Sequence, residues 1–126
     1  MCIRDSYIYN FENYKLDLAA NEVLSLANNT NLYLNDNQPW LLIKEKDNLP
    51  LVKEIIYNVL ESTRIIGLLL LPLLPELSTK INEQLGSIYR EEIPWKQQLS
   101  WGLLVSNSSI PKPTPIINKL VYEQHL

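Results

Sequence analysis

The residues in this sequence that are best suited to chemistry surround one tryptophan, and they favour binding over catalysis. Trp40 follows a proline directly, Asn37 and Gln38 precede that proline, and Lys44 and Lys46 come a few residues later. An aromatic ring for stacking, amides for base edges and lysines for phosphates are typical of a site for an unpaired nucleotide. The alternative is that Trp40 packs between two helices, and the spacing alone favours this packing interpretation while leaving both open.

The sequence contains few residues from which a catalytic site could be built. The chain has one cysteine, Cys2, and one histidine, His125, which argues against Ser/His/Asp or Cys/His catalysis, a zinc site and a disulfide framework. Its three glycines are too far apart to form a phosphate-binding loop. We therefore expect no catalytic residue, no metal site and no cofactor in this chain.

Composition indicates one globular domain without a membrane span. The chain has 126 residues, of which 46% are hydrophobic and 20% charged, and its net charge is −3. Proteins that hold nucleic acid mainly through phosphates carry a basic excess, so any such contact here must be local. The longest apolar run, residues 65–74, is far shorter than the about 20 residues of a membrane span and predicts a buried core helix.

Apolar residues at helical spacing predict the first two of three main helices. One is expected over about residues 12–35 and is ended by Pro39. The next begins where Asp47 or Asn48 can cap it, and Pro50 suits its first turn. The apolar stripe expected on this second helix is formed by Val52, Ile55, Ile56, Val59, Thr63, Ile66 and Leu70.

The rest of the chain predicts a third helix and then weaker structure. Pro72 and Pro75 end or kink the second helix, and a third is expected over about residues 75–85 with Gly86 as its C-cap. A short helix or turn with two tryptophans follows, and then an extended tail rich in proline. The fold class predicted is all-α, a bundle of three main helices plus this short element and the tail.

Four further side chains have structural interpretations. We expect Trp95 and Trp101 to pack in the core or between domains, and Tyr33 to pack on a helix face. Arg64 stands in an otherwise apolar helix, so it is expected to pair with an acid or a helix end, with a phosphate contact as the alternative.

The stretch ANNTNLYLNDNQPWLLIKE, residues 27–45, resembles the anticodon-binding domain of methionyl-tRNA synthetases, which are class I enzymes. The shared pattern is Asn31-x-Tyr33, then Pro39-Trp40, then Lys44. The segment VLESTRIIGLLLLPLLPELSTKINEQLG is similar to the long helix, Leu-Pro break and Gln-Leu-Gly ending of that family. WGLL and PKPTPIINKL are similar to its C-terminal tail, although Ile-Ile replaces the usual Leu-Phe. The resemblance covers nearly all of residues 7–120.

The resemblance implies an RNA site built around Trp40. Trp40 would stack on the first base of the CAU anticodon of methionine tRNA, and Asn31 and Pro39 would shape the same pocket. Physical inference adds Lys44 and Lys46 as contacts to the phosphates of the anticodon loop. These five residues are the RNA-binding candidates.

The resemblance also implies a larger enzyme. The intact protein would join methionine to its tRNA with ATP and magnesium in the cytoplasm or in an organellar stroma or matrix. This chain lacks the family's two nucleotide-binding signatures, so we expect it to be inactive alone and to have the N-terminal catalytic domain as a partner. We expect residues 1–6, MCIRDS, to be a non-native leader, and residues 7–126 to be a C-terminal fragment containing the anticodon-binding helical domain.

Two alternatives remain open at this point. The chain could come from another class I synthetase of the same helical type, specific for valine, leucine, isoleucine or cysteine. It could instead be a helical protein-interaction module with Trp40 as the anchor, since buried tryptophans often dominate protein interfaces.

Overall fold

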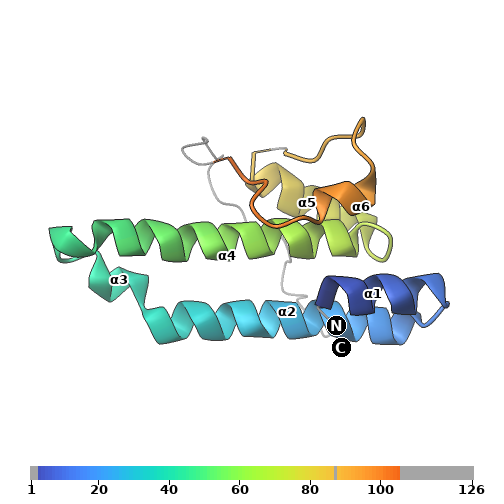
Figure 1. The fold of residues 1–126 in the computed structure, drawn as a ribbon, viewed down its shortest axis with the longest axis horizontal. Coiled ribbons are helices and arrows are strands. Elements are labelled where there is room, and N and C mark those ends of the chain that lie inside the picture. The colour runs from blue at the N-terminus through green and yellow to red at the C-terminus, as the bar shows by residue number, and fades with distance from the viewer. Residues whose placement is uncertain (1–2, 87, 106–126) are drawn as a thin grey trace, which may run out of the picture.

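The computed structural model describes residues 3–86 and 88–105, which form helices and no strands (Figure 1). This confirms the predicted all-α class. Three of the helices, α2, α4 and α5, are the predicted main ones, and there are four further elements among the described residues. The elements in order are α1 (Ile3–Glu12), α2 (Leu16–Asn37), α3 (Pro39–Leu42), the 3-10 turn η1 (Lys46–Asn48), α4 (Leu49–Leu70), α5 (Pro75–Gln84) and α6 (Trp95–Gln98).

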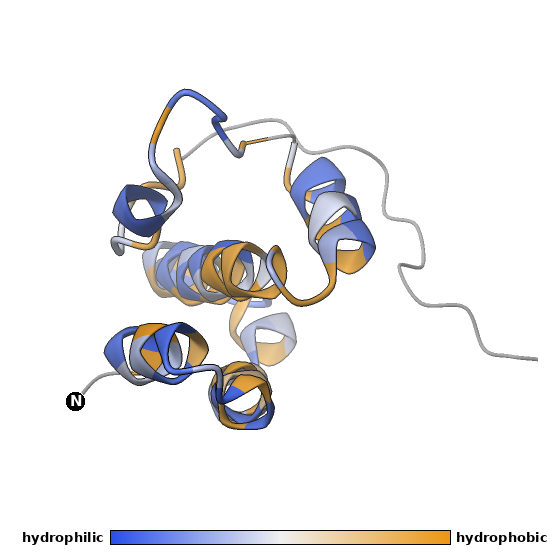
Figure 2. Cartoon of the chain, turned by 90° about the vertical axis from the view of Figure 1, so that its right-hand side faces the viewer, coloured by the Kyte–Doolittle hydropathy of each residue, from blue (hydrophilic) through white to orange (hydrophobic). Residues whose placement is uncertain are grey.

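Helix α4 is the central element of the bundle. Figure 2 shows it in the middle, with α1 and α2 on one side and α5 and α6 on the other. It contacts α2, α3, α5 and α6, whereas α1 packs on α2. The core lies where these layers meet and consists of Tyr7, Ala19, Val23, Ile65, Leu68, Leu69 and Leu99.

Helix α2 begins and ends close to the predicted positions. The chain leaves α1 through Tyr14, whose φ of 61° is left-handed and prevents one continuous helix. At the other end, Gln38 has a φ of 47°, and its N–H donates to the carbonyl of Leu34. Pro39 follows, so the prediction that it ends this helix is confirmed. Helix α1 was not predicted, and residues 3–6 form its first turn.

Helix α4 begins where predicted, but the expected cap does not form. Pro50 lies in the first turn, as its missing N–H permits. Asn48 precedes the helix, with φ −85° and ψ −5°, and its side chain makes no capping hydrogen bond. The capping prediction was wrong because the turn η1 leads the chain directly into α4, in helical rather than extended backbone.

The buried face of α4 differs from the predicted single stripe. Val52 and Ile55 are buried as expected, but Ile56 is exposed, and Thr63 and Ile66 are only half-buried. The second half of α4 is covered by α2 on one side and by α5 and α6 on the other, so a one-sided period could not describe it (Figure 2). The residues buried there are Glu61, Arg64, Ile65, Gly67, Leu68 and Leu69.

The third main helix, α5, ends as predicted. Gly86 has a φ of 96°, the left-handed conformation that glycine adopts readily after a helix. Ser78 of α5 donates a 2.6 Å hydrogen bond to the carbonyl of Gly67, which holds α5 close to α4. Among the described helices, none is long and apolar enough to cross a membrane. The predicted proline-rich tail lies outside the described residues.

Candidate nucleic-acid interface

Trp40 is carried by a short, well-anchored turn at the end of α2. Pro39 is buried where α3 meets α4, and the ring of Trp40, next in the chain, keeps 50% of its surface exposed. The carbonyl of Gln38 accepts hydrogen bonds from the N–H groups of Leu41 and Leu42, at 2.9 and 3.3 Å. The burial of Pro39 means that it fixes the direction of the chain, while Trp40 offers the accessible aromatic surface.

The two candidate lysines follow Trp40 closely and are free to reach solvent. Lys44 lies in the turn after α3, Lys46 begins η1, and both are exposed. In residues 3–86 and 88–105, no carboxylate pairs with either ammonium group. Glu45 and Asp47 alternate with them, so this stretch has no net charge and any phosphate contact would depend on the individual lysines.

Asn31 is exposed on α2, nine residues before Trp40 in the sequence. The core-facing positions of α2 include Ala19 and Val23, and the side chain of Tyr33 also points toward α4. Asn29 and Tyr33 are each two residues away from Asn31. At about 100° per residue, Asn31 therefore lies roughly 160–200° around α2 from both, on the opposite side of the helix. The described contacts do not join Asn31 to Trp40, so its role in the same pocket stays a prediction.

Tertiary structure places another aromatic residue over α2 and α4. Trp101 is 56% exposed, so it does not pack in the core of this chain, and the other expectation, packing between domains, stays a prediction. It lines a groove of about 310 Å³, which we call the Trp101 groove. The other lining residues are Leu26, Asn29, Thr30, Tyr33, Asn58 and Ser62.

The other two aromatic predictions hold. The indole N–H of Trp95 donates to the carbonyl of Leu68 at 2.7 Å, and its ring packs against the core. Tyr33 is half-buried, and its hydroxyl accepts a 2.9 Å hydrogen bond from Nδ2 of Asn58 on α4. No sequence signal joins residue 101 to residues 29 and 58, because only folding brings the chain after α6 back across α4.

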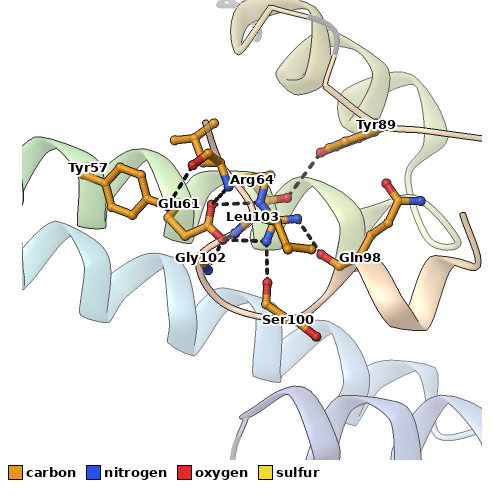
Figure 3. Close-up of polar contacts among 9 residues, drawn as sticks. Tyr57, Glu61, Arg64, Tyr89, Gln98, Ser100, Gly102 and Leu103 are labelled. Carbon is orange, nitrogen blue, oxygen red and sulfur yellow. Dashed lines mark hydrogen bonds and ion pairs between the residues drawn. The ribbon is translucent and has the colours of Figure 1, made fainter. Parts of the chain in front are cut away.

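A buried ion pair on α4 fixes that returning segment, and we call it the Glu61–Arg64 clasp (Figure 3). Arg64 Nη2 lies 2.6 Å from Glu61 Oε1, and Arg64 Nε lies 2.8 Å from Oε2. Both side chains are almost fully buried. The guanidinium also donates to the carbonyls of Gln98 and Ser100, at 2.5 and 2.8 Å. The prediction that Arg64 pairs with an acid or a helix end is confirmed.

The carboxylate of Glu61 holds the other side of the same segment. Its oxygens accept hydrogen bonds from the backbone N–H groups of Gly102, Leu103 and Leu104, at 2.8–3.1 Å (Figure 3). Tyr57, one turn earlier on α4, donates to the carbonyl of Leu104 at 2.9 Å. The backbone on both sides of Trp101 is therefore tied to α4, and the ring is set in place above the groove.

Comparison with known proteins gives the family. The methionine–tRNA ligase of Synechocystis is 34% identical over 120 residues, which cover 87% of this chain and 22% of the ligase. That of Nostoc is 31% identical over 115 residues, with the same two shares of 87% and 22%. The chain belongs to the methionine–tRNA ligase family. The ligase of Thermotoga maritima is 30% identical over 118 residues, or 93% of this chain and 18% of the ligase. No protein-family model matches the chain.

The chain spans about a fifth of the length of these methionine–tRNA ligases. The family resemblance noted in the sequence is thereby confirmed. Within the part of this ligase segment that the structure describes, no group of three metal-binding side chains comes together. What its geometry offers instead is two exposed tryptophan rings, Trp40 and Trp101, on rigid supports.

Electrostatics favours the charged state of the clasp in this methionine–tRNA ligase segment. Burial raises the pKa of the Glu61 carboxyl, but the hydrogen bond and the positive charge of Arg64, with the N–H groups of Gly102 and Leu103, lower it by more. The net result is a pKa below the usual value for glutamate. Glu61 is therefore ionised at neutral pH, and its charge is balanced inside the protein.

Proposed function

We propose that this chain recognises the anticodon of methionine tRNA, CAU, as part of a methionine–tRNA ligase. The observation that supports this most directly is the half-exposed Trp40 ring beside buried Pro39. A ring held in this way can stack on an unpaired base without first being ordered, and such stacking contributes about 1–3 kcal/mol per base. The relatives reported above are all methionine–tRNA ligases, which favours methionine over valine, leucine, isoleucine or cysteine.

The division of labour follows from what this chain contains. In the intact ligase, methionine would be joined to tRNA with ATP, and this segment would contribute RNA recognition beside the catalytic domain. We assign ATP and its magnesium ion to that other domain, because this sequence lacks the two nucleotide-binding signatures of the family. Trp40 would stack on the first anticodon base, Pro39 would set the direction of Trp40, and Asn31 would contribute an amide to the same pocket.

Phosphate contacts would add little to this affinity. The chain has a net charge of −3, and only Lys44 and Lys46 are candidates near Trp40. Two neutralised phosphates on single-stranded RNA give a slope of about −1.4 for the logarithm of affinity against the logarithm of salt concentration. A much steeper slope would mean that other basic residues bind the RNA.

Replacing Trp40 by alanine in this chain is expected to weaken binding of a short RNA hairpin with a CAU loop by about 5- to 150-fold, because one base loses its stacking surface. Fluorescence anisotropy of a labelled hairpin measures this. Leu41→Ala is the matched control, since Leu41 is the next residue and is 47% exposed. It should leave RNA affinity unchanged.

Two results would contradict the proposal. If W40A lowers the melting temperature strongly and leaves RNA affinity unchanged, Trp40 is a packing residue. If hairpins with CAU and with unrelated loops bind equally well, the chain does not read the methionine anticodon.

A second candidate function has one observation in its favour. Several apolar side chains near Trp40 in the sequence are exposed, which is typical of a protein-binding surface. Under this alternative Trp40 would anchor a protein partner, and the RNA titration above would show no binding that depends on Trp40. These side chains are Leu41, Ile43, Leu49 and Leu51.

A further inference from the structure

We propose that the Trp101 groove binds a second unpaired nucleobase of the RNA that Trp40 contacts. The inference rests on the proposed function for its choice of RNA, but the evidence for the groove is independent of Trp40. The groove combines an exposed indole ring with uncharged amide and hydroxyl groups from two helices. Those are the side chains that hold a flat heterocycle by stacking and by hydrogen bonds to its edge.

The polar groups of the groove are largely unused. Among the described residues, the side chains of Asn29 and Ser62 and the indole N–H of Trp101 make no hydrogen bond to protein. Asn58 uses its Nδ2 for Tyr33, which leaves its Oδ1 as an acceptor. The Tyr33 hydroxyl accepts that bond and keeps its own proton to donate. Donors and acceptors thus surround one stacking surface.

The size and charge of the groove favour a base over other ligands. Its volume of about 310 Å³ lies at the lower end of the roughly 300–1,000 Å³ found for small-molecule pockets, so it suits one flat group rather than a partner helix. No charged side chain lines it. The nearby carboxylate of Glu61 is balanced by Arg64 and by backbone N–H groups. A neutral site of this kind gives little attraction to a free phosphate or a charged peptide.

The groove is also preorganised. The Glu61–Arg64 clasp holds Ser100 on one side of Trp101 and Gly102 on the other, so a ligand would not have to order this segment. Thr30 in the groove and Asn37 at the end of α2 are about 10 Å apart along the helix, given the rise of about 1.5 Å per residue. The groove therefore begins about two turns before the end of α2, the end from which Gln38 and α3 carry Trp40.

The test compares Trp101→Ala with Leu103→Ala in the 126-residue chain. Leu103 is the matched control because it lies in the same segment and is 52% exposed. Trp101→Ala is expected to weaken binding of the CAU hairpin by about 5- to 150-fold, and Leu103→Ala to leave it unchanged. Asn29→Ala should weaken binding by about 2- to 10-fold, because it removes one hydrogen bond and no packing. The salt dependence of RNA affinity should not change in Trp101→Ala or Asn29→Ala, since neither variant loses a phosphate contact.

Nuclear magnetic resonance of the side-chain amides of Asn29 and Asn58 distinguishes the source of the base. Shifts with adenosine, cytidine, guanosine or uridine monophosphate would show that the groove holds a base without an RNA loop. Shifts with the hairpin alone would show that the loop delivers the base, and either result supports the proposal. No shift with any of these ligands, or an unchanged hairpin affinity in W101A, would overturn it.

The two aromatic sites can fail separately. Weaker binding in W40A but not in W101A leaves the proposed anticodon function in place and removes the second base site. Weaker binding in W101A but not in W40A supports the groove and removes Trp40 as the platform. A large drop in melting temperature for W101A with unchanged RNA affinity would make Trp101 a packing residue and overturn the inference.

Discussion

Replacing Glu61 by alanine is expected to lower the free energy of unfolding by about 3–5 kcal/mol. The carboxylate is fully buried, pairs with Arg64 and accepts backbone N–H groups from the segment after Trp101. Its removal would leave a buried guanidinium without a counter-charge and three N–H groups without an acceptor. Breaking one partner of a buried pair costs far more than the pair contributes as a whole.

Urea unfolding followed by circular dichroism measures the effect. Glu54→Ala is the matched control, because Glu54 lies on the same helix and is exposed. Its cost should stay within about 0.5 kcal/mol. A loss for E61A no larger than that of E54A would mean that the clasp contributes nothing to stability.

The same carboxylate makes stability depend on pH. The pKa of Glu61 is lower in the folded chain than the ordinary value of 4.5, so the unfolded chain binds more protons in the acid range. The contribution of Glu61 is complete above about pH 5 and is lost as the pH falls through the folded pKa. Urea unfolding from about pH 7 to pH 3 should therefore show a smaller difference between wild type and Glu61→Gln at low pH. A difference that stays constant would refute this assignment.

Tyr7→Ala is the second substitution with a large expected effect, a loss of about 3–5 kcal/mol. The Tyr7 side chain is fully buried, and its ring stacks on Phe11 at a centroid distance of 6.0 Å and lies 6.1 Å from that of Trp95. Its hydroxyl donates a 2.5 Å hydrogen bond to the carbonyl of Leu69. One residue of α1 thus joins α4 and α6, and alanine would leave a cavity where the three meet.

Two further variants separate packing from hydrogen bonding. Tyr7→Phe keeps the ring and should cost about 1 kcal/mol, the loss of one hydrogen bond. Tyr9→Ala, on the same helix at a 54% exposed position, should cost less than about 1 kcal/mol. Thermal unfolding of Y7A, Y7F and Y9A measures the order of their stability losses. Equal losses for Y7A and Y9A would show that α1 is not packed on the core as described.

The main helices could be predicted because their signals are local. Pro39, Pro50 and Gly86 restrict or permit the backbone conformation next to them, and each is found at the helix end predicted for it. Helix α1 was missed because its first turn, residues 3–6, was expected to belong to a non-native leader, although Phe11 follows Tyr7 at helical spacing and stacks on it. The buried face of α4 was partly wrong because a helix covered on two sides has no single stripe.

The candidate site was predictable only in part, for a similar reason. Trp40 could be chosen because its proline and amides are its sequence neighbours. Trp101 could not, because Asn29 and Asn58, which line the groove with it, come from two helices distant in the sequence. Arg64 was recognised as a paired charge, but Glu61 did not stand out among the exposed acids, since its burial comes from the segment that returns after α6.

The left-handed residue Gln38 couples the length of α2 to the orientation of the tryptophan that follows it. Gln38 is the single left-handed residue between α2 and α3, and α3 starts immediately after it. The direction of the Trp40 ring therefore depends on the residue at which α2 ends. One inserted or deleted residue within α2 would rotate the exit by about 100° and shift it by about 1.5 Å. Homologous chains that keep this platform should therefore vary freely in the surface residues of α2 but tolerate no single-residue gaps in it.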